Sequence, residues 1–227
     1  MTESIKGDLY PDIVAMGGLI SAIEETARKR GVELGRVHSQ YTSGPGLFVT
    51  AEVDSSRGRI SLSLGDWSRE FHIGIRENRF IWADGVTENL DELVGACAEW
   101  RSGTPVGNFA EKFPFMTPGR LARAREANES TPAQWTLLRT SEAFTEERLL
   151  VETFHEDGRF NDLFPILSHG TLRLSTNCGM PGAREIHVTP TPGGTYRVED
   201  TANPGPGRFA ASLEEALTAV AASLSRD

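Results

Sequence analysis

One short sequence pattern occurs twice in this chain and constrains its fold more than any other feature. Residues 69–73 read Arg-Glu-Phe-His-Ile, and residues 184–188 read Arg-Glu-Ile-His-Val. Each copy is followed by a turn, a strand that carries an aromatic residue and an amphipathic helix. The repeat therefore predicts that the two halves share one fold. It says little about chemistry, because a repeated architecture fixes shape and leaves the functional residues open.

The match between the copies continues beyond the repeated pattern. The second turn is one residue longer than the first, after which Phe80 is expected to match Tyr196 and Trp82 to match Val198. Each following helix begins with a capping residue three positions before a glutamate that can reach back to it. These starts read Asn-Leu-Asp-Glu at 89–92 and Ser-Leu-Glu-Glu at 212–215.

The order of apolar patterns predicts an α+β fold made of helix, antiparallel β-meander and helix, twice. A first helix is expected from Pro11 to Gly31. Strands are indicated by alternating apolar residues, which give each strand one apolar face. The predicted elements after the first helix are strands near 47–53, 60–64, 71–75, 171–176, 184–189 and 195–199, and helices at 90–101 and 145–156.

We expect three segments: a first unit at residues 1–105, a helical connector at 106–141 and a second unit at 142–227. The connector contains Pro114, Pro118 and Pro132, which would break its helices. The alternative is one compact, pseudo-symmetric domain. A loop rich in proline and glycine at 203–207 is expected before the last helix.

Composition excludes several classes of function. The chain of 227 residues is 38% hydrophobic with a net charge of -9, which argues against nucleic acid as a partner, since phosphates need a basic surface. No apolar run reaches the roughly 18 residues of a membrane span, and the N-terminus lacks a secretory signal pattern, so we expect a cytoplasmic protein. Cys97 and Cys178 have no metal or redox spacing and are expected to be reduced.

A polar row on one predicted strand is the best candidate site. His169, Thr171, Arg173 and Ser175 alternate with leucines and would share one face of the strand. We predict that His169 and Arg173 are the catalytic pair and that Thr171 and Ser175 contact the ligand, a carboxylate or a polarised carbonyl. The alternative is a solvated face with a cross-strand ion pair.

Trp67 is a further candidate ligand contact, because it lies in the turn Gly-Asp-Trp-Ser at 65–68, from which an indole often faces a cleft or partner. The other tryptophans are expected in the core.

The repeated Glu-x-His pairs, Glu70 with His72 and Glu185 with His187, put both side chains on one strand face. Four ligands would converge if the copies faced each other, but each pair is equally compatible with exposed residues, and we expect no metal. The sequence also lacks the Gly-x-Ser-x-Gly, Gly-x-Gly-x-x-Gly and Gly-Lys-Ser/Thr patterns. We therefore expect no nucleotide or other cofactor.

Several short motifs resemble one family. They read Leu-Tyr-Pro-Asp at 9–12, Cys-Ala-Glu-Trp-Arg-Ser-Gly at 97–103, Leu-Phe-Pro at 163–165, Ser-His at 168–169 and Leu-Arg-Leu-Ser at 172–175. Together they make most of the chain similar to uncharacterised, mostly actinobacterial proteins described as natural-product biosynthesis proteins. The resemblance implies a role in making a bacterial specialised metabolite and implies no catalytic residues.

Three functions remain open from the sequence. The first is an accessory protein that binds a biosynthetic intermediate, a carrier-bound chain or a precursor peptide. The second is a cofactor-independent enzyme of the cyclase or isomerase type, with His169 as acid/base and Arg173 holding an oxyanion. The third is an interaction module of the chaperone or inhibitor type, whose sheet face receives a partner segment. The sequence leaves the oligomeric state open.

Overall fold

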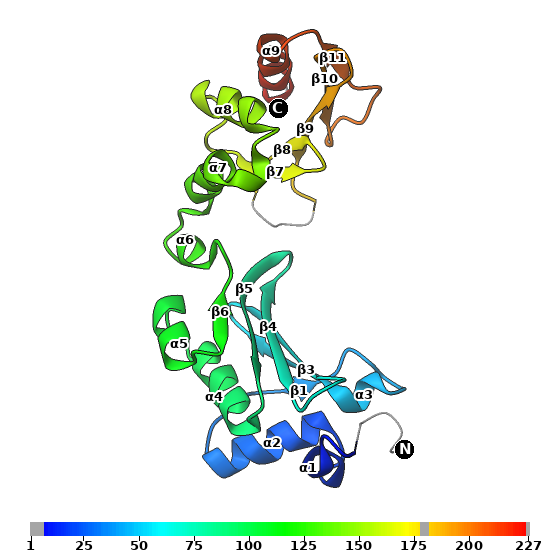
Figure 1. Ribbon diagram of the computed structural model, residues 1–227, viewed down its shortest axis with the longest axis vertical. Helices are drawn as coiled ribbons and strands as arrows, with labels where there is room; N and C mark the ends of the chain where they lie inside the picture. Colours follow the sequence, from blue (N-terminus) through cyan, green and yellow to red (C-terminus); the bar gives the residue numbers. More distant parts are fainter. Residues whose placement is uncertain (1–6, 178–181, 226–227) are drawn as a thin grey trace. The chain divides into compact units, whose positions relative to one another are not determined.

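A computed structural model describes residues 7–177 and 182–225, and the chain divides into two units, Met1–Glu126 and Ala127–Asp227. Each unit is α+β and contains an antiparallel sheet (Figure 1). The boundary lies inside the segment 106–141 that the sequence assigns to a connector, because part of that segment joins each unit. None of the helices in the described part of the chain is both long and apolar enough to cross a membrane.

The sheet of the first unit has the strand order β1-β2-β3-β4-β5-β6, with antiparallel neighbours. Its elements are α1 (Pro11–Ala15), α2 (Leu19–Arg30), β1 (Val37–His38), α3 (Gly46–Val49), β2 (Thr50–Ser55), β3 (Gly58–Leu64), β4 (Phe71–Glu77), β5 (Phe80–Thr87), α4 (Leu90–Arg101), α5 (Val106–Lys112), β6 (Met116–Pro118) and α6 (Ala122–Glu126).

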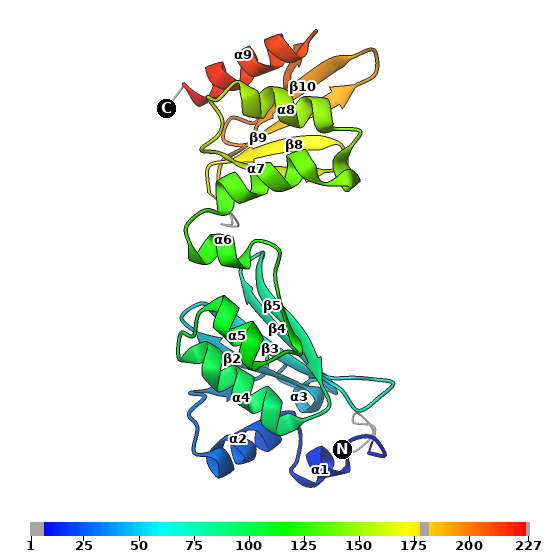
Figure 2. The ribbon, with the colours of Figure 1, turned by 60° about the vertical axis from the view of Figure 1, so that its left-hand side comes forward.

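The sheet of the second unit has the order β11-β10-β9-β8-β7, again antiparallel. Figure 2 shows α7, α8 and α9 together on one side of this sheet. The elements are α7 (Ser130–Thr140), a 3-10 turn (Glu142–Phe144), α8 (Arg148–Glu156), β7 (Phe164–Ser168), β8 (Thr171–Ser175), β9 (Glu185–Thr191), β10 (Thr195–Asp200), β11 (Arg208–Ala210) and α9 (Leu213–Leu224).

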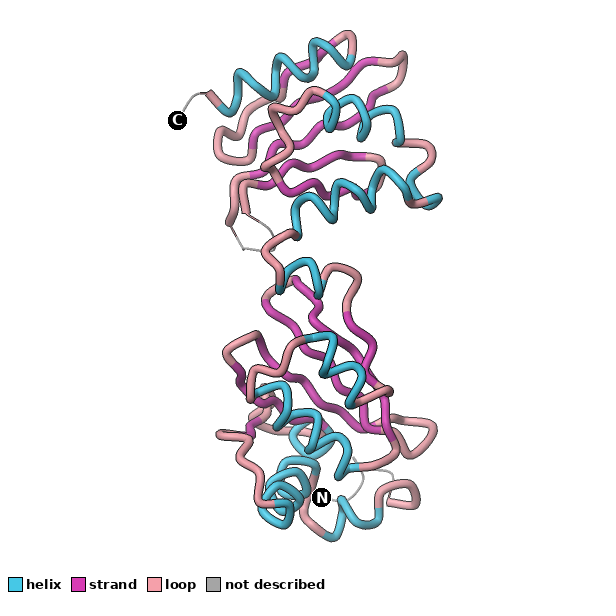
Figure 3. The backbone as a smooth tube through the Cα atoms, turned by 90° about the vertical axis from the view of Figure 1, so that its left-hand side faces the viewer, coloured by secondary structure: helices cyan, strands magenta, loops and turns pink. Residues whose placement is uncertain are grey.

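Each unit is a two-layer structure whose core lies between its helices and one face of its sheet (Figure 3). Alternation along each strand sends one set of side chains into that core and the next set outward. On β8, Leu172 and Leu174 are buried in the core, whereas Arg173 between them faces outward. The outward face carries the polar residues considered below, and we call it the open face of each sheet.

The first predicted helix is divided in two. Gly17 and Gly18 adopt φ angles of 88° and 125°, which glycine tolerates and other residues rarely adopt. They separate α1 from α2, so the prediction of one continuous helix is wrong there. The predicted stop at Gly31 is confirmed, because this residue ends α2 in the left-handed conformation. Similarly, residues 46–49 form α3 instead of the start of a strand.

Two helices start at the predicted capping residues. The Asn89 side chain accepts a hydrogen bond from the backbone N–H of Glu92 at 3.4 Å, and the Ser212 side chain accepts one from Glu215 at 3.2 Å. The carboxylate of Glu215 reaches back to the N–H of the residue before Ser212, at 2.7 Å. Glu92 instead accepts a hydrogen bond from the hydroxyl of Thr87 at 2.8 Å. The two helices therefore share a cap followed by a glutamate three residues later, but the two glutamates have different hydrogen-bond partners.

The sheet register limits the match between the copies. Ile73 lies opposite Gly85 in the first sheet, and Val188 lies opposite Val198 in the second. If the two Glu-x-His strands are aligned, Gly85 takes the place of Val198. The predicted equivalence of Trp82 with Val198 is therefore wrong.

An irregularity in the hairpin between β4 and β5 contributes one residue to this shift. The register changes between Ile75 and Arg76, where the pairing contains a β-bulge or irregularity. Such a feature adds a residue to one strand and displaces everything beyond it. The predicted equivalence of Phe80 with Tyr196 is also wrong, because Tyr196 lies opposite Pro190, and the aligned Ile75 lies opposite Ala83. A comparison of sequences near the turn has no means of detecting a bulge, since it leaves no signature in these residues.

Candidate functional site

The open face of the second sheet carries a cluster of three charged or titratable side chains. Arg173 on β8 lies directly opposite His187 on β9. Glu185 accepts hydrogen bonds from Arg173 Nε and Nη2 at 2.9 and 2.6 Å. The same oxygen, Oε2, lies 2.9 Å from His187 Nε2. One carboxylate therefore holds both the guanidinium and the imidazole.

The electrostatics of this cluster fix its hydrogen-bonding pattern. Burial raises the pKa of Glu185, but hydrogen bonds from His187 and Arg173 outweigh burial and hold the pKa below its usual value. Glu185 is therefore ionised near neutral pH and accepts from His187 Nε2. In the neutral imidazole this leaves Nδ1 as the acceptor, and Nδ1 has no hydrogen-bond partner among the described residues.

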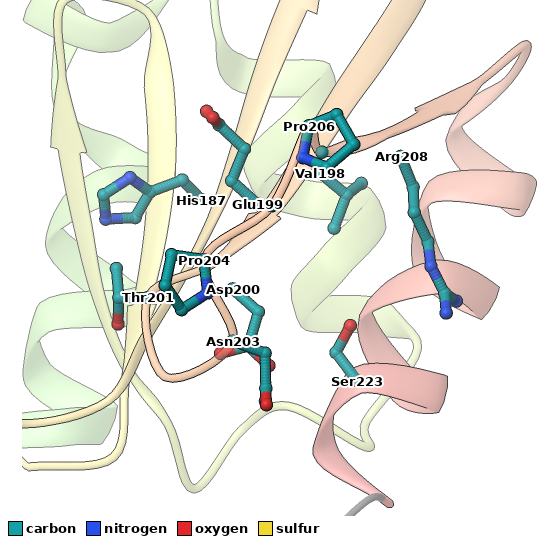
Figure 4. A pocket seen from close by; sticks show the side chains of 12 residues that line it. His187, Val198, Glu199, Asp200, Thr201, Asn203, Pro204, Pro206, Arg208 and Ser223 are labelled. Atoms are coloured by element: carbon teal, nitrogen blue, oxygen red, sulfur yellow. The ribbon is translucent and has the colours of Figure 1, made fainter.

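A hollow of about 440 Å³ adjoins His187. Figure 4 shows His187 and Glu199 on its strand side, Pro204 and Asn203 on the loop, and Ser223 on helix α9. The predicted Pro/Gly-rich loop at 203–207 thus lies over the hollow as part of its wall. The other lining residues are Val198, Asp200, Thr201, Gly205, Pro206, Gly207 and Arg208.

Two lining residues of the hollow, Asp200 and Ser223, are held by Arg184. Arg184 donates to both carboxylate oxygens of Asp200, at 3.1 and 2.8 Å, and to the carbonyl oxygen of Ser223 at 2.7 Å. These contacts join β9, β10 and the end of α9. The guanidinium of Arg184 lowers the pKa of Asp200 far below its ordinary value. Asp200 is therefore a structural carboxylate and a poor candidate for proton transfer at neutral pH.

His169 does not lie in the polar row that the sequence predicts. It occupies the turn between β7 and β8 with φ of 51°, and Gly170 follows with φ of 75°. Two consecutive positive φ angles are the mark of a tight hairpin turn. The imidazole Nδ1 lies 3.0 Å from the Ser168 hydroxyl, and His169 does not line the hollow. His187 is instead the histidine opposite Arg173.

Thr171 and Ser175 lie on β8 as predicted, and both hydroxyls have partners within the protein. The Thr171 hydroxyl lies 3.0 Å from that of Thr189, as a cross-strand pair. Ser175 is 2% exposed and donates to the carbonyl oxygen of Asn177 at 3.0 Å. Ser175 is thus engaged in the local backbone and has almost no surface to offer a ligand. Of the predicted row, only Arg173 belongs to the cluster around Glu185.

Trp67 lies in the first unit, at the tip of the predicted turn, and is 92% exposed. The turn is held from beneath by Tyr10, whose hydroxyl lies 2.9 to 3.0 Å from three of its carbonyl oxygens and accepts from the N–H of Glu70. This anchoring fixes the backbone of the turn that carries the exposed indole. Trp67 does not line any of the hollows described for this unit.

The two Glu-x-His pairs occupy separate units, and Glu70 and His72 are 3.7 Å apart at Oε2 and Nε2. Among residues 7–177 and 182–225, no three His, Cys, Asp or Glu side chains are placed to hold a metal ion. Cys97 is fully buried, and burial raises the pKa of its thiol to about 12, which makes it a poor nucleophile. Cys178 lies outside the described residues.

Sequence reasoning missed the partners of Arg173, although the signal was present. The Glu-x-His spacing places Glu185 and His187 on one face of β9, and that face turns out to be the face of Arg173. The sequence does not reveal the register between β8 and β9. This register brings Arg173 on β8 beside the Glu-x-His pair on β9. Arg208 carried no sequence signal at all, since it reaches the hollow through the short strand β11.

The second unit is also the part of the chain that resembles known sequences. The profile of a family of unknown function (DUF6193) matches residues 129–227, which contain the Glu185 cluster and the hollow. No curated protein and no solved structure matches the chain.

Proposed function

We propose that the second unit binds an acidic group of a biosynthetic intermediate or precursor peptide, and that the protein is an accessory factor of bacterial natural-product biosynthesis. The observation that carries the binding role is the Glu185 cluster, in which one carboxylate holds both Arg173 and His187, and His187 lines a hollow. The pathway rests on the resemblance of several short motifs to natural-product biosynthesis proteins.

The charges of the hollow favour an anionic group. Glu199 is paired with Arg197 at 2.7 Å, and Asp200 is paired with Arg184. Arg208 has no ion-pair partner among the described residues, and His187 adds an imidazole. A carboxylate that enters the hollow therefore meets the uncompensated cation Arg208, while the carboxylates of the wall are already neutralised. The accepting Nδ1 of His187 suits a hydrogen-bond donor elsewhere on the ligand.

The test compares two histidine variants in a strain that makes the metabolite. We expect His187→Ala and Arg208→Ala to deplete the product or accumulate its precursor, with the protein still present at normal abundance. His169→Ala is the matched control, because it makes the same substitution on the same sheet outside the hollow. Equal metabolite profiles for both histidine variants at equal abundance would exclude this binding role.

A cofactor-independent enzyme of the cyclase or isomerase type is the second candidate, and the Glu185–His187 contact supports it. In this proposal Glu185 orients the imidazole and His187 Nδ1 transfers the proton, so the role first assigned to His169 moves to His187. Arg173 donates Nε and Nη2 to Glu185, which makes it a positioning group more than an oxyanion holder. The accumulated precursor serves as the substrate in the test. Glu185→Gln would lower its turnover about a hundredfold while binding persists. If the protein only binds the precursor, the wild type shows no turnover.

We further propose that the units arose by duplication. Both contain a Glu-x-His pair at the start of the strand before a hairpin, with Glu70 directly before β4 and Glu185 as the first residue of β9, and both place a capped helix after their meander. One feature departs from strict repetition, since β6 follows α4 and α5 whereas β11 precedes α9. An experimental structure in which β3 to β5 and β8 to β10 do not superpose would contradict the proposal.

A further inference from the structure

The open face of the first sheet combines three features that weaken a β-sheet, and all three surround Ser61. Glu52 is a buried carboxylate on the solvent side of the sheet. Gly74 interrupts a central strand, and Arg59 lies directly opposite Arg76. Like charges opposite each other and glycine within a strand both destabilise sheets. None of these three features helps the sheet to fold.

Glu52 is the most unusual of the three. Its neighbours Ala51 and Val53 are buried in the core, so Glu52 points to the open face, yet it is only 7% exposed. Its Oε2 lies 3.4 Å from His38 Nε2 and 3.3 Å from Arg59 Nη1. Oε1 has no partner among the described residues. Burying a charge is unfavourable unless it is paired, so this carboxylate is held by two partners with one oxygen to spare.

Gly74 makes room for a second ion pair. It lies between Ser61 and Asp84 in the row across the sheet. A Cβ at this position would collide with the guanidinium of Arg76. That guanidinium lies over the glycine and forms an ion pair with Asp84, with Nη2 2.9 Å from Oδ1. The glycine thus lets Arg76 lie flat on the sheet, away from Arg59, with Ser61 between the two arginines.

The result is a shallow, hydrogen-bonding hollow. Two adjoining hollows, of about 440 and 500 Å³, share Glu52, Ser61 and Arg76 in their walls. The hydroxyls of Ser61 and Ser63 have no partner among the described residues. Arg59 pairs with Glu52 and Arg76 pairs with Asp84, so the region shared by the two hollows holds matched charges and offers spare donors beside spare acceptors. The exposed Asp54 adds one further carboxylate to the second hollow.

We propose that this hollow binds a neutral, polyhydroxylated ligand such as a sugar unit. Adjacent hydroxyls of such a ligand donate to Glu52 Oε1 and accept from Arg76, Ser61 and Ser63, without a change in net charge. Departures from the rules of stable sheets tend to mark functional sites, and three such departures lie around one serine. The site belongs to the first unit and does not depend on the function proposed for the second.

The experiment is a titration of the full-length protein with methyl α-glucoside, methyl β-galactoside, N-acetylglucosamine and maltose, followed by backbone amide NMR. At least one saccharide should shift the amides of Ser61 and Gly74 saturably, with millimolar or tighter affinity. Glu52→Gln and Ser61→Ala should each weaken that binding about tenfold, since each removes a hydrogen bond to the ligand. Glu33→Gln is the matched control on an exposed carboxylate outside the hollow.

Sodium sulfate and spermidine serve as anionic and cationic competitors. The proposal is overturned if none of the four saccharides gives a saturable shift, if sulfate or spermidine saturates the same amides instead, or if the saccharide binds Glu52→Gln as tightly as the wild type. Ser61→Ala keeps the test decisive should Glu52→Gln unfold, because this exposed serine contributes nothing to the core.

Discussion

The two Glu-x-His pairs share a spacing and differ in their neighbours. In the first unit Glu70 and His72 are 3.7 Å apart and roughly two-fifths exposed, whereas Glu185 and His187 are 2.9 Å apart and more deeply covered. The residue opposite the histidine differs as well: it is Ser63 in the first sheet and Arg173 in the second. A pair on one strand thus becomes a fixed site only when the next strand supplies a third group.

The arginines that begin each repeated pattern make a parallel comparison. Arg69 donates from both Nη atoms to the two carboxylate oxygens of Asp12, at 2.8 Å each. Arg184 makes a similar bidentate pair with Asp200, and this pair is about one-tenth exposed, against more than one-third for the first. The arginine that begins the repeated pattern therefore forms a partly exposed ion pair in the first unit and a nearly buried ion pair in the second.

Removing these two arginines should have the largest effects. We expect Arg184→Ala to destabilise the second unit by about 3 kcal/mol, because it leaves Asp200 charged and nearly buried. Arg69→Ala should destabilise the first unit by about 1 kcal/mol or less. Urea unfolding can be followed unit by unit through the indole N–H signals of Trp135 and Trp100 in NMR spectra. Equal losses of stability in the two units would show that the two ion pairs contribute equally despite their different burial.

Acid should weaken the second unit through the same ion pair. Arg184 lowers the pKa of Asp200 from its ordinary value of 3.8, so the carboxylate binds protons less readily in the folded state than in the unfolded state. Its stabilisation is complete above about pH 4 and is lost as the pH falls further. In Asp200→Asn, the midpoint of urea unfolding should be lower at neutral pH and depend less on pH in this acid range. An unchanged acid dependence would show that other carboxylates control it.

The sequence predicted the elements of both units better than the site. Helix α4 begins and ends where the apolar spacing and the cap at Asn89 place it, at Leu90 and Arg101. Short edge strands such as β1, β6 and β11 gave no signal, since two or three residues are too few to show alternation. His169 was misplaced because a histidine at positive φ looks like any strand residue in a sequence.

Removing the helix caps tests whether the two closing helices depend equally on their first residues. Asn89→Ala and Ser212→Ala should each lower the stability of their own unit by about 1 kcal/mol. The double variant should show the sum, because the residues belong to different units and share no partner. Unfolding of the single and double variants, read from the same indole signals, measures both terms. A deficit much larger than the sum would indicate that the units stabilise each other.

Exchanging the residues opposite the two histidines should have the smallest effect on stability and the clearest effect on the sites. In Arg173→Ser the pKa of Glu185 should rise toward its ordinary value of 4.5, because one of the two groups that lower it is gone. Stability should change by less than about 1 kcal/mol, as for other partly exposed ion pairs.

The reciprocal change, Ser63→Arg, places a guanidinium opposite His72 and within the row that contains Glu70. A double-mutant cycle with Glu70→Gln should then reveal a coupling of about 0.5 kcal/mol, while Glu70→Gln alone in the wild type changes little. NMR titration of the glutamate carboxyl signals, with urea unfolding beside it, measures both exchanges. If Arg173→Ser left Glu185 unchanged, His187 alone would hold that carboxylate, and the difference between the two Glu-x-His pairs would lie in their burial and not in the strand beside them.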